Sequence, residues 1–396
     1  MKKIVLIIAY SICLVGFSQE TISIMSYNIL NFPGNTWERV NGLEKIIKYK
    51  TPDIFVVNEL ISEVGANLIL DSALNIGGVT HYSKASFVNG YDSDNLLFYN
   101  HNKLSLHSQT QIPTDLRDIS HYVLYFDNLI NNDTVWFNVF SCHLKSSSGD
   151  LNEFKRYEEV QQLKNYLSAY NIEDNLFVAG DFNFYSNFEE AYYEITTGGT
   201  SNLFDPINKE ALWHNNYNFK GIHTQSTRGA TIGLGGGSLG GLDDRFDFIF
   251  ISEDLFSGEN YVRVKDNSYI AVGQDGEHFD NAVNFSVNNS APDSIIQALY
   301  TMSDHLPVYM ELEIGNFSAI SSNENEKVYT FSFSNEKVII KTNQPFYMSV
   351  YTSDGRLVMD RENNEIIKVS ELNNGLYFCK IQIQGRYYIE KIIISK

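Results

Sequence analysis

An aspartate and a histidine stand side by side at Asp304 and His305, where a loop runs into the apolar strand predicted for Val308–Ile314. The pair is the last of a series of polar residues that lie at the ends of strand-like runs. The series consists of Asn28, Glu59, His143, Asp181 with Asn183, Asp247, and Asp304 with His305. Sites in sheet proteins gather beyond strand ends, where loops shape a pocket on a rigid base. We therefore expect these side chains to converge on one site.

Carboxylate, amide and imidazole groups in one set indicate a site for a divalent cation. Carboxylate and amide oxygens suit a hard cation, so we expect Mg²⁺, with Ca²⁺ or Mn²⁺ as alternatives. Two histidines among several aspartates are also compatible with zinc, whereas the absence of cysteine from the set excludes a thiolate zinc site. A cation that offsets charge and an imidazole that transfers protons are groups that hydrolytic chemistry uses.

Each member of the series also has a plainer interpretation. Glu59 could cap a helix, and His143 could be a hydrogen-bonded core histidine. Asp181 lies in a Gly-Asp-Phe-Asn stretch that could be an ordinary Asx turn. Asp247 alternates with phenylalanines along a strand and could face solvent. The sequence leaves these alternatives open for each residue taken alone.

The elements that would position these residues alternate between strands and helices. Strands are predicted at 21–28, 54–57, 134–143, 175–179 and 245–251, and helical periodicity covers 37–49 and 64–73. Asp150 has capping-box spacing to Glu153 and is predicted to cap a further helix. Residues 266–301 are predicted to be irregular. The glycine-rich stretch 229–241 lacks the flanking strand and helix of a phosphate-binding loop, which favours a mobile surface loop that could cover the site.

The ordered set resembles the motifs of the endonuclease/exonuclease/phosphatase superfamily, which has the deoxyribonuclease I-like fold. The matching stretches are SYNI at 26–29, DIFVVNE at 53–59, HLK at 143–145, GDFN at 180–183, RFDFI at 245–249 and SDHLPV at 303–308. One departure is Asn58, where the family usually has glutamine. The resemblance covers residues 20–314 and implies an α/β fold, a sandwich of two mixed sheets flanked by helices with the site at one end.

The resemblance also implies roles for the matched residues. Glu59 is expected to be the principal metal ligand, helped by Asn28 and Asp304. Asp247 and His305 are expected to form an oriented pair in which the carboxylate holds the tautomer of the imidazole.

The remaining roles concern water and phosphate. Asp181 and Asn183 are expected to position the attacking water and the phosphate, and His143 to be the second imidazole found in the nuclease and sphingomyelinase branches. Looser matches assign Asp94 as the partner of His143 and Arg117 as a ligand of the substrate phosphate.

Composition divides the chain into four segments. Residues 1–19 begin with Met-Lys-Lys and continue into a short apolar run, which predicts a signal peptide that is cleaved. Residues 20–314 form the predicted catalytic domain, and the polar stretch 315–325 is the predicted linker. Residues 326–396 alternate short strands with tight turns, so we expect a small all-β sandwich there.

The C-terminal segment resembles the sorting domain of the type IX secretion system, through VSELNNGLYF at 369–378 and KIII at 391–394. The Tyr-Pro-Asn-Pro element that often opens such domains is missing. A plain β-sandwich accessory domain is the alternative. The resemblance implies that the secretion machinery is a partner and that the protein is secreted, extracellular or at the cell surface.

The rest of the composition narrows the class of protein. No other apolar stretch is long enough to span a membrane, so we expect no stable membrane insertion, and we expect a monomer. Cys142 and Cys379 are predicted to be buried free thiols without a disulfide.

Charge bears on the choice of substrate. Residues 20–323 carry 17 Lys and Arg against 39 Asp and Glu, a net charge of −22, which works against binding of a phosphate backbone. Divalent cations could offset this repulsion locally. We expect a secreted metal-dependent phosphodiesterase, an endonuclease acting on nucleic acid. The alternatives are a sphingomyelinase-like or other small-molecule phosphohydrolase, and a non-catalytic binding protein on the same fold.

Overall fold

The computed structural model describes residues 20–34, 37–199, 201–209, 211–229, 236–317, 329–334, 337–342, 344–352, 356–362, 366–383 and 386–394. Two compact units divide the chain between Phe317 and Ser318. The predicted signal peptide (1–19) and residues 318–325 of the predicted linker lie outside the described residues. Among the described residues, no helix is long and apolar enough to cross a membrane.

The first sheet of the first unit is mixed and has seven strands. Its order is β10 (Val262–Val264), β12 (Val308–Ile314), β1 (Glu20–Phe32), β2 (Ile54–Leu60), β4 (Asp94–Asn100) and β3 (Tyr82–Lys84), and β11 (Ile270–Ala271) also pairs with β12. Strands β1 and β2 are parallel, while the other neighbours are antiparallel.

The second sheet has five strands in chain order. These are β5 (Leu104–Ile112), β6 (Ile119–Phe126), β7 (Trp136–His143), β8 (Leu176–Asp181) and β9 (Asp247–Ile251). Strands β7 and β8 are parallel, while the other neighbours are antiparallel. Each sheet therefore contains one parallel pair, and the carboxyl ends of such a pair meet at one edge.

Buried strands such as β8 contribute to two apolar layers at once. Phe177 and Ala179 belong to the core that includes both sheets, whereas Val178 belongs to a second cluster with Leu163 and Leu167 of a helix. This arrangement follows from the period of two along a strand, which sends alternate side chains to opposite faces. It explains why β8 reads as a continuous apolar run.

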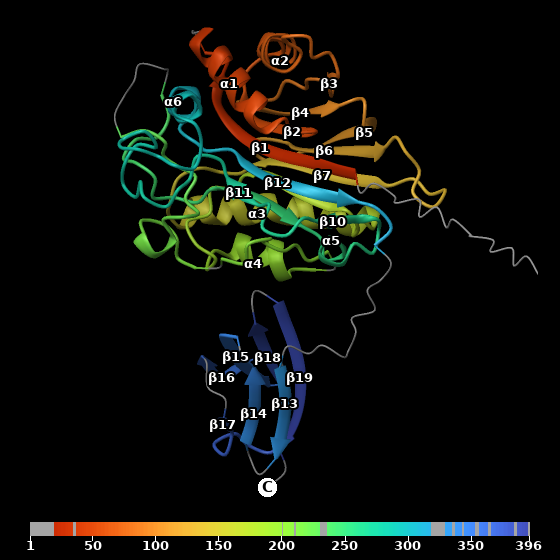
Figure 1. Cartoon of the computed structure of the whole chain (residues 1–396), viewed down its shortest axis with the longest axis vertical. Helices are drawn as coiled ribbons and strands as arrows, with labels where there is room; N and C mark the ends of the chain where they lie inside the picture. Colours follow the sequence, from red (N-terminus) through yellow and green to blue (C-terminus); the bar gives the residue numbers. More distant parts are fainter. Residues whose placement is uncertain are drawn as a thin grey trace, which may run out of the picture. The chain divides into compact units, whose positions relative to one another are not determined.

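Helices cover the outer faces of the two sheets (Figure 1). One side has α1 (Trp37–Lys50), α2 (Glu63–Ile69) with the π-helical turn η1 (Leu70–Leu74), and α6 (Asp293–Met302), and the other has α3 (Asp150–Tyr170) and α4 (Glu190–Thr197). Two short elements, η2 (Tyr217–Phe219) and α5 (Asp254–Ser257), lie in the later loops. The predicted sandwich of two mixed sheets flanked by helices is confirmed.

The second unit is all β, as predicted. A three-stranded sheet has the order β13 (Tyr329–Ser334), β14 (Lys337–Thr342), β17 (Ile366–Lys368), and a four-stranded sheet has the order β16 (Leu357–Glu362), β15 (Phe346–Thr352), β18 (Gly375–Ile383), β19 (Arg386–Ile394). The two sheets share a separate apolar core that includes Val338, Met348 and Ile381. The free thiol of Cys379 is buried in this core, and Cys142 is buried in the first unit, which confirms both as unpaired.

Two local predictions were wrong, and a third was right in extent. The helix predicted at 64–73 is present as α2 followed directly by the π-helical turn. Asp150 does not cap α3: the N-cap residue is Gly149, and no side chain caps the helix. The stretch predicted to be irregular, 266–301, contains β11 and most of α6, which begins after Pro292.

Candidate active site

The two parallel strand pairs bring the predicted residues to one end of the sandwich. In the first sheet β1 and β2 run in register, which places Asn28 and Glu59 at the same edge. In the second sheet His143 of β7 lies opposite Asp181 of β8, which in turn lies opposite Asp247 of β9. Asn28 joins the two sheets, because its Nδ2 donates to Glu59 Oε1 at 2.9 Å and to Asp181 Oδ2 at 2.9 Å.

Glu59, His143 and Asp181 form a cluster of potential metal ligands. One ligand atom from each lies within 4.8 Å of the others. His143 Nε2 is 3.9 Å from Glu59 Oε1 and 3.7 Å from Asp181 Oδ2. Glu59 has a left-handed backbone with φ of 59°, and its Oε2 accepts a hydrogen bond from the backbone nitrogen of Asn31 at 3.1 Å. The structure thus contains an acidic and imidazole site that can hold a metal ion.

The electrostatics of this cluster fit a divalent cation. Burial raises the pKa of Glu59, and it raises the pKa of Asp181 to about 7. Neighbouring carboxylates add to both shifts, Asp304 acting on Glu59 and Asp247 acting on Asp181, although His305 opposes them. Carboxylates gathered in a buried site ionise more readily when a cation offsets their charge. Glu59 is the residue shared by this cluster and the predicted set of Glu59, Asn28 and Asp304.

His305 lies between two aspartates. Its Nδ1 is 2.8 Å from Asp247 Oδ2, which is the predicted contact, and its Nε2 is 3.7 Å from Asp181 Oδ2. Burial disfavours a charged imidazole, but Asp247, Asp181 and Asp304 together raise the pKa of His305 well above its ordinary value. The amide nitrogen of Gln225 also lies 2.6 Å from Nε2 and can donate to that nitrogen when it is unprotonated.

Asp304 is held by the glycine-rich stretch that the sequence indicated as a possible cover for the site. Its Oδ2 accepts hydrogen bonds from the backbone nitrogen of Ser238 at 2.6 Å and from Gln225 Nε2 at 3.2 Å. A Cβ on Gly237 would lie 2.9 Å from the Asp304 carboxyl group, so this approach requires glycine. Residues 230–235 of the stretch lie outside the described residues.

Asn183 contacts the residue that follows His143, and Arg117 lies within electrostatic reach of His143. The side chain of Asn183 donates to the carbonyl oxygen of Leu144 at 3.3 Å. Arg117 Nη2 pairs with Asp92 at 2.7 Å, whereas its Nε and Nη1 are buried without a hydrogen-bond partner among the described residues. The charge of Arg117 acts on both Glu59 and His143.

Asp94 is not brought to His143 by any hydrogen bond between described residues. Its Oδ1 accepts from the backbone nitrogen of Gly90 at 2.6 Å, and its pKa is raised by burial and by the carboxylates of Asp118 and Asp92. Within the described part of the chain, His143 Nδ1 is buried without a partner. The proposed pairing of Asp94 with His143 stays a prediction.

The plainer interpretations can be weighed against this geometry. The cap of α2 is Ser62, whose Oγ accepts from the backbone nitrogen of Gly65 at 3.1 Å, and not Glu59. Asp247 is 1% exposed and does not face solvent. The Asx turn is present, since Asp181 Oδ1 accepts from the backbone nitrogen of Asn183 at 3.1 Å, but Oδ2 of the same carboxylate faces the site.

A buried polar network joins the two sheets close to the site, and sequence reasoning missed it. Asn58 Nδ2 donates to Asn95 Oδ1 at 2.7 Å, to Ser141 Oγ at 3.1 Å and to the carbonyl oxygen of Cys142 at 3.1 Å. Asn95 Nδ2 donates in turn to the carbonyl oxygen of Ser141 at 3.1 Å. The one sequence signal for this network was Asn58 itself, which stands where the family usually has glutamine.

Two buried arginines support the segment that leads to Asp304. Arg39 Nε donates to the carbonyl oxygen of Met302 at 3.0 Å, and Arg228 Nε donates to that of Tyr300 at 3.2 Å. Each is 1% exposed. Nothing in the spacing of these arginines indicated this contact, because both depend on the fold of distant segments.

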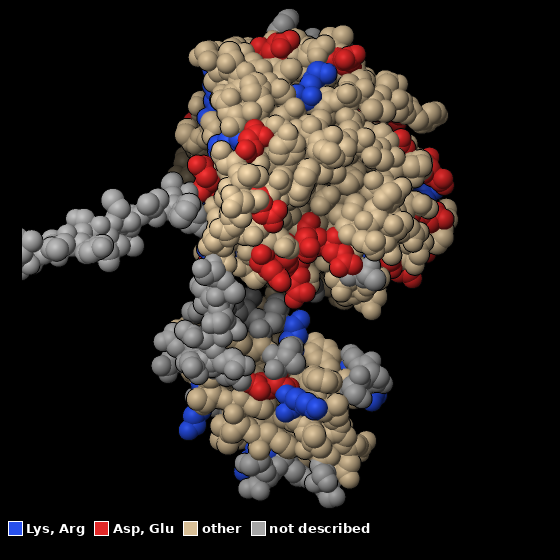
Figure 2. Space-filling model, turned by 90° about the vertical axis from the view of Figure 1, so that its right-hand side faces the viewer, with Lys and Arg blue, Asp and Glu red and all other residues tan. Residues whose placement is uncertain are grey.

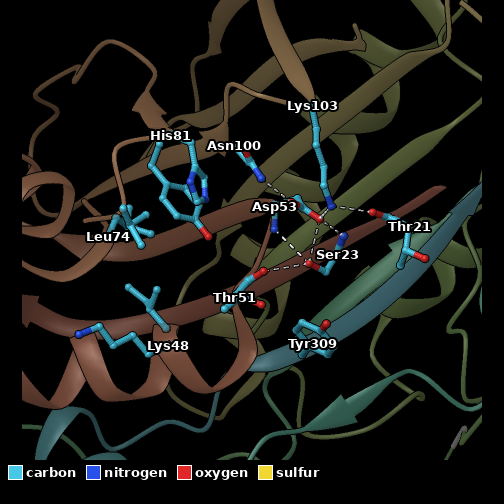
Figure 3. Close-up of a pocket in the computed structure, with 13 residues that line it drawn as sticks. Thr21, Ser23, Lys48, Thr51, Asp53, Leu74, His81, Asn100, Lys103 and Tyr309 are labelled. Atoms are coloured by element: carbon cyan, nitrogen blue, oxygen red, sulfur yellow. Dashed lines mark hydrogen bonds and ion pairs between the residues drawn. The ribbon is translucent and has the colours of Figure 1, made fainter. Parts of the chain in front are cut away.

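A pocket of about 380 Å³ lies at the opposite end of the first sheet (Figure 3). Its polar wall is formed where β1 and β2 begin: Asp53 Oδ2 accepts from Lys103 Nζ at 2.9 Å and from the backbone nitrogen of Ser23 at 3.1 Å. These groups satisfy one another, and none of the predicted site residues lines this pocket.

The sequence matches two family profiles. Residues 25–305 match the Endonuclease/Exonuclease/phosphatase family, and residues 334–395 match the secretion system C-terminal sorting domain. No curated protein matches the chain.

Solved structures with a similar fold share little sequence with the chain. D. rerio TDP2 humanized by 14 mutations is 16% identical, with 74% of this chain and 98% of that chain covered and a TM-score of 0.48. An endonuclease/exonuclease/phosphatase family protein from Bacteroides thetaiotaomicron is 15% identical, with coverage of 75% and 99% and a TM-score of 0.47. A mannosyl-6-phosphatase from the same organism is 16% identical, with coverage of 74% and 99% and a TM-score of 0.46. Because the first profile covers most of the chain, the protein belongs to the Endonuclease/Exonuclease/phosphatase family of phosphoric ester hydrolases, and it carries a C-terminal sorting domain.

Proposed function

We propose that the protein is an exported, metal-dependent phosphodiesterase that cleaves nucleic acid. The observation that carries this proposal is the position of His305, 2.8 Å from Asp247 and 3.7 Å from Asp181, beside the cluster that Asp181 forms with Glu59 and His143. Hydrolysis of a phosphate ester requires an oriented water, a group that transfers protons and positive charge near the phosphate oxygens. The site offers groups for each task.

The side chains around His305 move protons and orient the water. Asp247 accepts the Nδ1 proton of His305, so Nε2 is the nitrogen that exchanges a proton with the reacting groups. Asp181 lies within 3.7 Å of the Nε2 atoms of both His305 and His143, which suits a carboxylate that orients the attacking water between them. Asn183, held by Leu144 and Asp181, would contact the phosphate.

The ligands of the cation include Glu59. The family motifs predict that Asn28 and Asp304 bind the cation together with Glu59. The distances in the structure instead group Glu59 with His143 and Asp181. A divalent cation bound there, Mg²⁺ in our proposal, supplies positive charge that offsets the charge on the phosphate oxygens.

A local group of positive side chains supports a substrate with more than one phosphate. Burial and the charges of Arg117, Lys155 and Arg156 lower the pKa of Lys145, so each of these cations lies within electrostatic reach of Lys145, and Arg117 also acts on Glu59. Arg156 is itself buried and paired with Glu189, which leaves Arg117, Lys145 and Lys155 as the cations for phosphate. The domain around them has a net charge of −22. Phosphates that flank the scissile bond of a nucleic acid strand would bind at such a group.

A small-molecule or lipid phosphodiester is the second candidate, and surface charge favours it. Figure 2 shows acidic side chains gathered into a patch on one face of the first unit, with Lys and Arg only scattered. A long polyanion is repelled by such a surface, whereas a small ester meets only the site itself.

A panel of substrates distinguishes the candidates. The mature protein is offered plasmid DNA, RNA, sphingomyelin and bis-p-nitrophenyl phosphate, each with Mg²⁺ or with EDTA. We expect cleavage of nucleic acid with Mg²⁺ and none with EDTA. Activity that survives EDTA rules out the cation, cleavage of sphingomyelin alone favours the second candidate, and no hydrolysis of any ester favours a non-catalytic binding protein.

Replacing His305 tests the centre of the proposed site. His305→Ala should lower turnover by about 10²–10⁴-fold, because proton transfer by a positioned imidazole contributes about that factor. His278→Ala is the matched control, since His278 is also buried and its Nδ1 lies 2.8 Å from Asp275 Oδ1 outside the site. Full activity in His305→Ala would remove the proposed mechanism.

Export is proposed to have two steps. We propose that residues 1–19 are removed as a signal peptide and that the secretion machinery then reads the C-terminal domain, a reading which the sorting-domain match supports. N-terminal sequencing of the exported protein should find a new terminus near Ser18 or Gln19. We also propose that the exported protein is a monomer, which size-exclusion chromatography would measure. An intact Met1 on the exported protein would contradict the first step.

A further inference from the structure

Gln225 is fixed by its backbone between two segments of the candidate site. It forms isolated β-bridges with Asp244 and with His305. Its backbone nitrogen donates to the carbonyl oxygen of Asp244 at 3.0 Å, and its carbonyl oxygen accepts from the backbone nitrogen of Asp243 at 2.9 Å. The residue is 9% exposed, so its side chain has little freedom to turn away from the site.

The amide group of Gln225 contacts both members of the Asp304 and His305 pair. Its Nε2 lies 2.6 Å from His305 Nε2 and 3.2 Å from Asp304 Oδ2. An amide nitrogen carries two hydrogens, so it can donate to both acceptors at once. With Gln225 as donor, the ring proton of His305 lies on Nδ1, where Asp247 accepts it at 2.8 Å. The imidazole is therefore held at both nitrogens.

We propose that Gln225 is a positioning residue for the hydrolytic reaction, one that fixes the tautomer and ring orientation of His305 and ties the ring to Asp304. The inference rests on the proposed function of His305. It adds a residue to that function, because neither the strand-end pattern nor the family motifs included Gln225. Asp247 alone leaves the ring free to tilt about its Nδ1 contact, and a second hydrogen bond at Nε2 removes that freedom.

The position of the amide also bears on substrate binding. His305 Nε2 lies 3.7 Å from Asp181 Oδ2, on the side where water and phosphate would react. A phosphate oxygen that approaches Nε2 therefore comes within reach of the Gln225 amide nitrogen. The amide holds the ring before the substrate arrives and must release Nε2 when that nitrogen exchanges a proton with the reacting groups.

Kinetics of Gln225→Leu provide the first test. Leucine keeps a similar volume and all the backbone contacts, but it has no donor. On bis-p-nitrophenyl phosphate with Mg²⁺, we expect kcat to fall about 10-fold or more and KM to change by less than about 3-fold, because orientation affects the reacting state more than binding. Gln274→Leu is the matched control, since among the described residues Gln274 Nε2 donates only to the carbonyl oxygen of His223 at 2.8 Å, and it should retain wild-type kcat.

A double-mutant cycle separates a role through His305 from a general structural role. In the His305→Ala background, Gln225→Leu should cost nothing further, because the group that it positions is absent. An equal loss in both backgrounds would overturn the inference, as would a wild-type kcat in Gln225→Leu.

A spectroscopic test does not depend on turnover. In protein labelled with ¹⁵N-histidine, the His305 signals are those that disappear in His305→Ala. At a pH high enough to leave the ring neutral, the wild type should show a ring protonated at Nδ1 with a hydrogen bond at Nε2, and in Gln225→Leu the Nε2 signal should move toward that of a nitrogen without a hydrogen bond. Identical His305 signals in both proteins would overturn the inference about Gln225. An inactive wild type with the expected signals would instead overturn the proposed function.

Discussion

Asp247 uses one carboxylate oxygen to hold His305, while its other oxygen, Oδ1, is buried without a hydrogen-bond partner among the described residues. We therefore propose that Asp247 serves the imidazole rather than the stability of its strand. A carboxylate in this place fixes the tautomer of the ring and stabilises its charged form. An amide of the same shape keeps the packing but loses the charge.

We expect Asp247→Asn to lower kcat by about 10²-fold or more while KM stays within about 3-fold. Steady-state kinetics on bis-p-nitrophenyl phosphate with Mg²⁺ measure both values. Asp275→Asn is the control, because Asp275 makes the same 2.8 Å contact to Nδ1 of His278 outside the site. Equal losses in the two variants would mean that the effect is on folding and not on catalysis.

The pKa of Asp181 predicts how pH affects the stability of the metal-free protein. Burial raises this pKa to about 7. A carboxyl group whose pKa is higher in the folded than in the unfolded chain stabilises the fold at low pH, and this contribution is lost as pH rises through about 7. The Tm of EDTA-treated protein should therefore fall between about pH 5 and about pH 8.

The same argument predicts the response to Mg²⁺. A cation favours ionised carboxylates, so Mg²⁺ should raise Tm more at about pH 8 than at about pH 5. Glu159→Gln serves as a control, because the pKa of Glu159 is also raised to about 7 by burial, but it is not part of the metal cluster. That variant should keep the Mg²⁺ response. A Tm shift that is the same at both pH values would contradict the proposed cation site.

Residues that lie at strand ends could be predicted from the sequence, whereas residues fixed by loops could not. Asn28, Glu59 and Asp181 follow apolar runs whose period marks them as strands. Gln225 follows no such run, and its role depends on a contact 80 residues away along the chain. The roles of all these residues stay predictions, since geometry places them together without showing turnover.

At the scale of elements, the buried strands could be predicted from the sequence. The polar edge strand β5 and the short helix α6 could not. The strand β5 (Leu104–Ile112) has four polar residues in its second half and lies at the edge of its sheet, so it lacks the apolar signal of β8. Helix α6 is short, and the loop residues before it gave no helical period. Its apolar residues pack onto α1, and this long-range contact supplies the stability that local pattern does not show.

The connection between the sheets can be tested through Asn58. Asn58→Ala leaves Asn95 Oδ1 and Ser141 Oγ without their shared donor, and an unsatisfied buried group costs about 1–3 kcal/mol. We expect a loss of about 2–3 kcal/mol in the free energy of unfolding, measured by urea denaturation. Asn128→Ala, at an exposed position, should change it by less than about 0.5 kcal/mol. Equal stability of the two variants would show that the network contributes little.

At the scale of the whole molecule, the two units have separate apolar cores. The first unit contains the core shared by its sheets and the cluster beneath α3, and the second unit contains its own cluster. A unit with its own core can fold alone. The boundary between Phe317 and Ser318 is the natural place to divide them.

We expect a chain truncated after Phe317 to fold cooperatively and to keep kcat/KM within about 2-fold of the mature full chain. Circular dichroism, thermal unfolding and steady-state kinetics measure these properties. The truncated chain should no longer be exported by cells that secrete the full chain. A truncated chain that aggregates or loses turnover would show that the C-terminal domain supports the catalytic unit.

The division of the site between two sheets has a consequence for when the protein can act. Asn28 and Glu59 come from the first sheet, whereas His143, Asp181 and Asp247 come from the second. The side-chain amide of Asn28 donates to Glu59 in its own sheet and to Asp181 in the other. Neither sheet alone contains all of the groups that we propose for hydrolysis. We therefore expect a nascent or partly folded chain to be inactive, and activity to appear only when the two sheets have packed together. For an exported hydrolase, such a delay would protect the phosphate esters of the cell that makes it.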